Sequence, residues 1–212
     1  MEKQKMTVMD FQKYKDEGRK FSYVTAYDYT TASIVDDSDV EVILVGDSLG
    51  MIMLGYKGTT AVTMDDMIHH IRPVVQGAPH TFVIGDMPFG SYQGNEMEGL
   101  ASAIRIMKES HADALKLEGG EEIIDTVKRI ISAGIPVMGH LGLMPQSINK
   151  YGTYTVRAKD DAEADKLIRD AHLLEEAGCF AIVLEKIPAT LAERVAAELT
   201  IPIIGIGAGG HV

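Results

Sequence analysis

Five apolar runs in this chain each end in one ionisable side chain. The first is the VILVGDS run at residues 42–48, and TFVIGD at 81–86 repeats its plan closely. The side chains that close the five runs are Asp47, Asp86, Glu118, His140 and Glu185. An unpaired charge in a buried strand costs much free energy. Five ionisable side chains, each at the end of its own strand, therefore need a shared explanation. The pattern predicts buried strands that deliver polar groups to one end of a sheet, which we interpret as a metal-centred active site.

Strand and helix patterns alternate along the chain, as in consecutive βα units of a parallel sheet. Strands are expected at residues 21–27, 42–48, 81–86, 112–118, 135–140, 180–185 and 202–206. An open doubly wound sheet would concentrate its polar strand ends at a switch point, whereas a barrel places every strand end around one mouth. Five consecutive polar ends favour the barrel. The predicted fold is an α/β TIM (β/α)8 barrel.

Local signals mark where helices begin. Thr7 with Asp10, and Thr63 with Asp66, match the capping box with Asp in place of Glu. Helices are also expected at residues 96–110, 121–133 and 160–177, and a loop at 51–62. Only seven strands are visible, so we expect one barrel domain over residues 1–212 that is truncated after its seventh strand, without the eighth strand and the C-terminal helices.

Composition narrows the classes of protein. The 212 residues are 46% hydrophobic and 24% charged, which is ordinary for a globular core, and the net charge of −11 disfavours nucleic-acid and anionic membrane partners. The start lacks a signal-peptide core, and no run approaches the ~20 apolar residues of a membrane helix. The single cysteine, Cys179, sits at a strand start and is interpreted as a small apolar residue. These features predict a soluble, cytoplasmic protein.

Strand geometry places Lys116 and Glu118 on one face of their strand, because alternate residues point the same way. An internal ion pair is the simplest explanation of such a pair, but acids on the neighbouring strands favour function. Oxygen ligands from Asp47, Asp86 and Glu118 would select a hard divalent cation, with Mg²⁺ as the first choice. A single histidine at a strand end, such as His140, is more often a hydrogen-bonding or substrate-binding group than a metal ligand.

A magnesium site beside a lysine and a spare carboxylate suits enolisation of a 2-oxo acid. Glu185 is the candidate base in this hypothesis. Lys116 would neutralise the substrate anion, and Ser48 can offer its hydroxyl and backbone N–H to the same anion.

Two other motifs carry weaker signals. His69 and His70 are adjacent on a predicted helix and point about 100° apart, so a solvated or packing role is favoured over shared metal binding. The glycines at 205–210 fit G-x-G-x-x-G formally, but they follow the seventh strand rather than the first, so a simple turn is preferred.

Six motifs taken in order resemble the ketopantoate hydroxymethyltransferase family (3-methyl-2-oxobutanoate hydroxymethyltransferase) over essentially the whole chain. They are VTAYD at 24–28, VGDSLGM at 45–51, DMIHH at 66–70, KLEGG at 116–120, GHLGLMPQS at 139–147 and IPIIGIGAG at 201–209. The family usually continues with a strand beginning DGQ and a helical region. Lys186 stands where the family often has a small residue or cysteine.

The resemblance implies a reaction and a set of roles. A one-carbon unit would pass from 5,10-methylenetetrahydrofolate to 3-methyl-2-oxobutanoate, giving 2-dehydropantoate in pantothenate and coenzyme A biosynthesis. One Mg²⁺ per subunit would be held by Asp47, Asp86 and Glu118, the last through water. Asp47, Ser48, Asp86 and Lys116 would contact the oxo acid, His140 would line the pocket, and Glu185 would accept the proton. Family members assemble as decamers.

Two alternatives stay open on the sequence alone. One is a related magnesium barrel that acts on phosphoenolpyruvate-like or isocitrate-like substrates. Such families typically use a reactive cysteine or phosphate-binding arginines near the site. The other is a truncated, non-catalytic chain that folds through subunit contacts.

Overall fold

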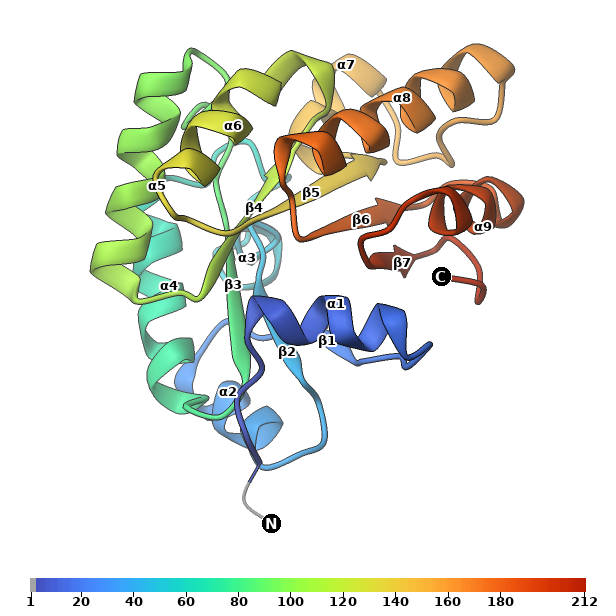
Figure 1. Cartoon of the computed structure of the whole chain (residues 1–212). Helices are drawn as coiled ribbons and strands as arrows, with labels where there is room; N and C mark the ends of the chain where they lie inside the picture. The colour runs from blue at the N-terminus through green and yellow to red at the C-terminus, as the bar shows by residue number, and fades with distance from the viewer. Residues whose placement is uncertain (1–2) are drawn as a thin grey trace.

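Seven parallel strands form one sheet in the computed structural model, which describes residues 3–212 (Figure 1). Their spatial order is their order in the chain, and they curve into a nearly closed barrel. Within the described residues, β1 and β7 each pair with one strand only. The strands are β1 Tyr23–Thr25, β2 Val42–Val45, β3 Phe82–Asp86, β4 Ala114–Glu118, β5 Val137–Gly142, β6 Ala181–Glu185 and β7 Ile203–Ile206.

Helices cover the outer side of the sheet, and sequence neighbours pack side by side from α2 through α4, α5, α6 and α8 to α9 (Figure 1). The longer helices are α1 Val8–Asp16, α2 Tyr29–Asp36, α4 Met64–Gly77, α5 Glu96–Ser110, α6 Ile124–Ser132, α8 Asp161–Ala177 and α9 Ala189–Glu198. Short elements are α3 Leu49–Ile52, η1 Glu121–Ile123, η2 Pro145–Ser147 and α7 Ile148–Tyr151. This arrangement confirms the predicted barrel class.

All seven expected strands are present, and the helix expected at residues 96–110 has those bounds. The capping boxes at Thr7 and Thr63 are also formed. Two expectations on local structure were wrong. The strand expected at 42–48 ends at Val45, because the chain turns at Gly46 into α3, which also occupies the start of the expected loop. The helix expected at 121–133 begins as the 3₁₀ turn η1.

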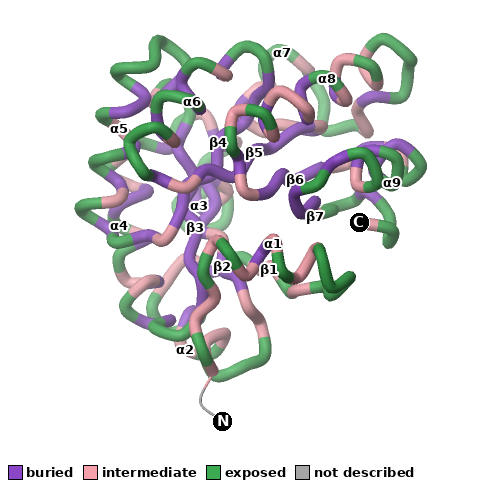
Figure 2. Tube along the Cα trace, viewed as in Figure 1, coloured by how far each residue is buried: buried purple, intermediate pink, exposed green. Residues whose placement is uncertain are grey.

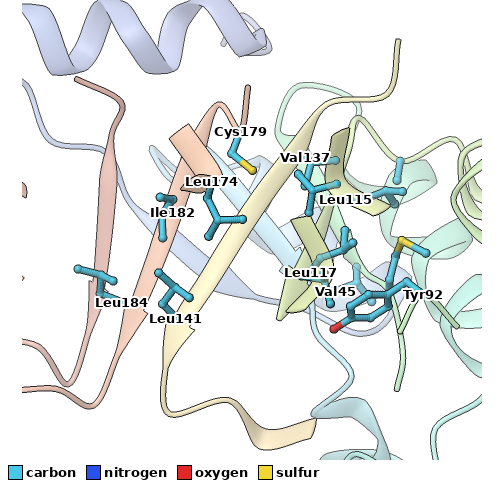
Figure 3. Close-up of a cluster of buried hydrophobic side chains, with 14 of the residues drawn as sticks. Val45, Tyr92, Leu115, Leu117, Val137, Leu141, Leu174, Cys179, Ile182 and Leu184 are labelled. Carbon is cyan, nitrogen blue, oxygen red and sulfur yellow. The ribbon is translucent and has the colours of Figure 1, made fainter. Parts of the chain in front are cut away.

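Strand residues alternate between two hydrophobic cores. Leu115, Leu117 and Val137 face outward and pack under the helices, where Figure 3 shows them with Leu174 and Cys179. Residues of the other parity, such as Ile84, Ala114 and Met138, fill the barrel interior. The inner strands, β2 to β6, are therefore buried on both faces, whereas the edge strands β1 and β7 are partly exposed and the outward turns of the helices are exposed (Figure 2).

Cys179 is buried, and burial raises the pKa of its thiol to about 12. It packs with the outer core and behaves as the small apolar residue that the sequence predicts. In residues 3–212, helices of the length and apolar character needed to span a bilayer are absent.

Phe11 on α1 plugs the N-terminal end of the barrel. Its ring is fully buried and makes edge-to-face contacts with Phe21, Phe82 and Phe180, at centroid distances of 5.0, 5.1 and 5.0 Å. Lys15 of the same helix donates a hydrogen bond to the carbonyl of Ala196 in α9. Helix α1 therefore links the first part of the chain to the last.

Replacing Phe11 with alanine should lower the free energy of unfolding by about 3–5 kcal/mol, because the substitution leaves a cavity among three aromatic rings. Urea denaturation followed by circular dichroism measures the change. Met9→Ala on the same helix is the matched control, since Met9 is 77% exposed and its loss should change stability by no more than about 0.5 kcal/mol. Equal effects of the two substitutions on the free energy of unfolding would contradict the claim that Phe11 stabilises the N-terminal end of the barrel.

Candidate active site

The polar strand ends meet at one mouth of the barrel, as the sequence predicts. Strand register places Asp86 beside Lys116, Glu118 beside His140, and Gly142 beside Glu185. Gly142 is required there: it has a φ of +92°, and a Cβ on it would lie 2.3 Å from the Glu185 carbonyl oxygen. The register alone therefore collects ionisable side chains from four adjacent strands.

Asp47 joins this group from beyond the end of β2. Its backbone N–H donates a 3.0 Å hydrogen bond to Asp86 Oδ2. The backbone of Asp47 is therefore in direct contact with the side chain of Asp86. Both residues are 3% exposed. Ser48, next to Asp47, precedes the first residue of α3, and its hydroxyl lies 2.8 Å from the Tyr27 hydroxyl.

The buried acids repel one another. Burial, together with the charges of Asp86 and Glu118, raises the pKa of Asp47 to about 8. Burial also raises the pKa of Asp86, although the nearby Lys116 opposes that change. Buried carboxylates that disfavour each other's charged form are typical of sites that bind a cation or transfer a proton.

Lys116 lies on the same face of β4 as Glu118, as predicted, but its ion pair is with Asp86. The Lys116 Nζ to Asp86 Oδ1 distance is 3.0 Å, and both side chains are 4% exposed. Burial lowers the pKa of Lys116, but the charges of Asp86 and Glu118 outweigh burial and leave this pKa above its ordinary value. The lysine is therefore held as a cation at the barrel mouth.

His140 connects two acids across the barrel mouth. Its Nδ1 lies 3.5 Å from Glu118 Oε1 and 3.2 Å from Lys116 Nζ, and its Nε2 lies 3.4 Å from Glu185 Oε2. Burial and the charge of Lys116 lower the pKa of His140, but the contacts with Glu118 and Glu185 outweigh them and raise it overall. Within the described residues, His140 thus makes its hydrogen-bond contact through Nδ1, whereas its buried Nε2 has no hydrogen-bond partner.

Glu185 differs from the other acids in its access to solvent. Its side chain is 25% exposed, whereas the side chain of Glu118 is 3% exposed. A partly open carboxylate beside a histidine has the placement of a group that exchanges protons with a bound molecule.

Two buried residues at the mouth were not assigned from sequence. Gln146 in η2 donates to Asp47 Oδ2, and Tyr92 accepts a hydrogen bond from the backbone N–H of Glu118. Gln146 lies inside the motif GHLGLMPQS. The motif marked this segment as part of the family resemblance, but it did not indicate what Gln146 contacts. Tyr92 follows β3 in a loop and gave no comparable signal.

The two weaker motifs take no part in this network. His69 is exposed, and His70 Nδ1 contacts the carbonyl oxygen of Tyr27 at 2.7 Å, which fits the expected packing role. The glycine run after β7 forms a turn with positive φ at Gly207 and Gly209.

The acids at the mouth have the oxygen chemistry of a site for a hard cation. Protein N–H groups already orient one oxygen each of Asp47, Asp86 and Glu118, and the second Asp86 oxygen, Oδ1, lies 3.0 Å from Lys116 Nζ. Over residues 3–212, however, His, Cys, Asp and Glu side chains do not form a group of three or more arranged to hold a metal ion. The buried carboxylates are nonetheless the oxygen donors that a hard divalent cation takes.

Fold and site together define an α/β-barrel enzyme whose polar groups lie at the C-terminal ends of its strands. Solved structures agree on the fold. A phosphonopyruvate hydrolase complex with oxalate and Mg²⁺ superposes with a TM-score of 0.65 at 15% identity, covering 96% of this chain and 82% of that one. A 2,3-dimethylmalate lyase of the PEP mutase/isocitrate lyase superfamily superposes with a TM-score of 0.62 at 12% identity, covering 94% and 80%.

Residues 5–212 match the family model for ketopantoate hydroxymethyltransferase. Relatives named 3-methyl-2-oxobutanoate hydroxymethyltransferase are 76% identical in Bacteroides thetaiotaomicron and 61% identical in Porphyromonas gingivalis. Each alignment spans 208 residues, which is 98% of this chain and 76% of the relative. This chain belongs to the ketopantoate hydroxymethyltransferase family, as its motifs indicate, and is thereby placed among transferase enzymes.

The raised pKa of Asp47 predicts a specific pH dependence of stability when a chelator keeps metal away. The native state holds this proton up to a pH near 8, whereas the unfolded chain releases it near pH 4. The stabilising contribution of Asp47 is therefore present in acid and falls as the pH rises toward 8.

Asp47→Asn removes this contribution, so its stability relative to the parent should rise between pH 5 and pH 9. Urea unfolding with EDTA across this range measures the difference. Asp39→Asn, at an exposed position, is the control and should track the parent at every pH. If the curve of Asp47→Asn also ran parallel to that of the parent, the buried carboxyl would not titrate as described.

Proposed function

We propose that this chain transfers a one-carbon unit from 5,10-methylenetetrahydrofolate to 3-methyl-2-oxobutanoate and forms 2-dehydropantoate (ketopantoate), for pantothenate and coenzyme A biosynthesis. The names of its close relatives support the oxo acid and the hydroxymethyl transfer. The observation that carries the proposal is the pairing of one partly open acid, Glu185, with buried acids and a lysine at the barrel mouth.

Asp47 and Asp86 would hold a single Mg²⁺, with Glu118 contacting it through water. The burial of the three carboxylates and the mutual repulsion of the acids support this assignment. When bound, the ion supplies Lewis-acid polarisation of a keto oxygen, which is worth several kcal/mol in the transition state.

Lys116 and Ser48 would bind the anionic end of the oxo acid, together with Asp47 and Asp86. Lys116 stays charged in a site from which water is largely excluded, where its attraction for a carboxylate or enolate is stronger than in bulk water. The Ser48 hydroxyl is oriented by Tyr27 and stands next to Asp47. The substrate is thereby fixed with its C3 atom free to face the remaining acid.

Glu185 would accept the proton from C3 of the oxo acid. Its side chain is the most exposed acid of the network, and it lies 3.4 Å from His140 Nε2, which would line the pocket beside it. The C3–H bond breaks, the proton moves to a Glu185 oxygen, and the electron pair forms the new bond from C3 to the methylene carbon of the folate. The bonds from that carbon to the folate nitrogens break, a water molecule supplies the hydroxyl group of the product, and tetrahydrofolate leaves. A positioned base of this kind contributes about 10²–10⁴-fold to the rate.

We also propose a cytoplasmic homo-oligomer, with a decamer expected from the family. Apolar side chains left exposed after β2 support association between subunits. They are Met51, Ile52, Met53, Leu54 and Tyr56, with exposed fractions of 41, 67, 44, 38 and 39%.

Glu185→Gln and Asp86→Asn should each lower folate-dependent formation of 2-dehydropantoate by at least about 100-fold, because each variant keeps the shape of the side chain and removes its charge. Product formation with Mg²⁺ and both substrates measures the effect. Glu176→Gln, on the exposed face of α8, is the control and should retain full activity.

Exchange of the C3 hydrogen of 3-methyl-2-oxobutanoate with deuterated water separates the two halves of the proposal. The parent should catalyse this exchange without folate, and Glu185→Gln should not. Full activity in either site variant would remove the role assigned to that residue. Turnover of phosphonopyruvate but not of the oxo acid would replace the proposed reaction with the alternative magnesium-barrel chemistry.

A further inference from the structure

Gln146 lies between two acids of the candidate site and has no role in the mechanism described above. It is part of η2, four residues after the end of β5, and is 4% exposed. A buried amide must satisfy both its donors and its acceptor, so its contacts identify what the residue does.

Two donors of Gln146 reach two different acids. Its side-chain Nε2 donates to Asp47 Oδ2 at 2.9 Å, and its backbone N–H donates to Glu118 Oε2 at 3.0 Å. Asp47 comes from the β2 end and Glu118 from the β4 end, so these two bonds set the position of one carboxylate relative to the other.

The orientation of the amide is fixed by its other neighbours. Nε2 also donates to the carbonyl oxygen of Met87 at 2.9 Å, and a carbonyl oxygen can only accept. On the opposite side, Oε1 accepts from the Tyr92 hydroxyl at 2.7 Å and from Gln93 Nε2 at 3.1 Å. A flipped amide would place its oxygen against the Met87 carbonyl, so only the observed orientation satisfies every partner.

We propose that Gln146 is a positioning residue that holds Asp47 and Glu118 at the spacing the candidate metal and substrate site requires. The inference rests on the proposed function. Glutamine suits the task because it is a neutral donor among acids: a glutamate would add a further carboxylate beside Asp47, and an asparagine is one methylene too short to keep both its donor and acceptor contacts.

Gln146→Met tests the proposal, because methionine has a similar volume but donates no hydrogen bond to Asp47. Mn²⁺ serves as the probe, and its affinity is measured by electron paramagnetic resonance in the absence of substrates. We expect affinity to fall by about 10–100-fold, the range found when groups that orient metal ligands are lost. Gln146→Glu should also weaken binding if orientation matters, even though it adds a negative charge.

Gln76→Met is the matched control, because Gln76 is an exposed glutamine on α4 and should leave Mn²⁺ affinity unchanged. Steady-state kinetics provide a second readout. With Mg²⁺ saturating, Gln146→Met should raise the KM for the oxo acid more than it lowers kcat, because the residue orients binding groups and does not touch the transferred proton. A residue that only stabilised the fold would change neither Mn²⁺ affinity nor KM in the folded protein.

Each outcome decides between the hypotheses. Parent protein that fails to bind Mn²⁺ overturns the proposed function itself. Parent protein that binds Mn²⁺ while Gln146→Met binds it equally well overturns only the positioning role. If Gln146→Met does not fold, Gln146→Asn takes its place with the same readouts, and parent-like affinity in that variant rejects the inference.

Discussion

Burial of several carboxylates around one lysine is the constraint on which this structure depends. An ionised acid in a barrel interior is tolerated only when other groups compensate its charge and fill its hydrogen-bonding capacity. Lys116 compensates Asp86, His140 approaches Glu118, and Gln146 donates to Asp47. The compensation is incomplete, as the raised pKa of Asp47 shows, and that residual repulsion leaves the site suited to a cation.

The two ends of the barrel divide stability and chemistry. Phe11 closes the N-terminal end with aromatic contacts, and apolar residues fill the interior above it. This apolar interior strengthens the electrostatic interactions between the charged side chains at the other end, because such interactions grow as water is excluded. Removal of apolar packing at the bottom would therefore weaken the fold without touching a reacting group.

The likeness to phosphonopyruvate hydrolase and 2,3-dimethylmalate lyase extends to the fold, whereas the motifs and the close relatives identify the family. A barrel presents strand ends to a common mouth whatever the reaction, so the choice of side chains at those ends carries the chemistry. Here those side chains combine a partly open acid with buried acids and a buried cation.

The sequence by itself determined the strands, the parity of Lys116 and Glu118, the acids that close the strands, and the family. These are local properties, because hydrophobic periodicity and strand alternation depend on residues near one another in the chain. Only the tertiary structure decided that Lys116 pairs with Asp86, that α3 begins directly after Gly46, and that Gln146 reaches Asp47 across 99 positions. Those contacts follow from strand register and from how loops fold over the barrel mouth, and no local pattern encodes which distant partner a buried side chain will meet.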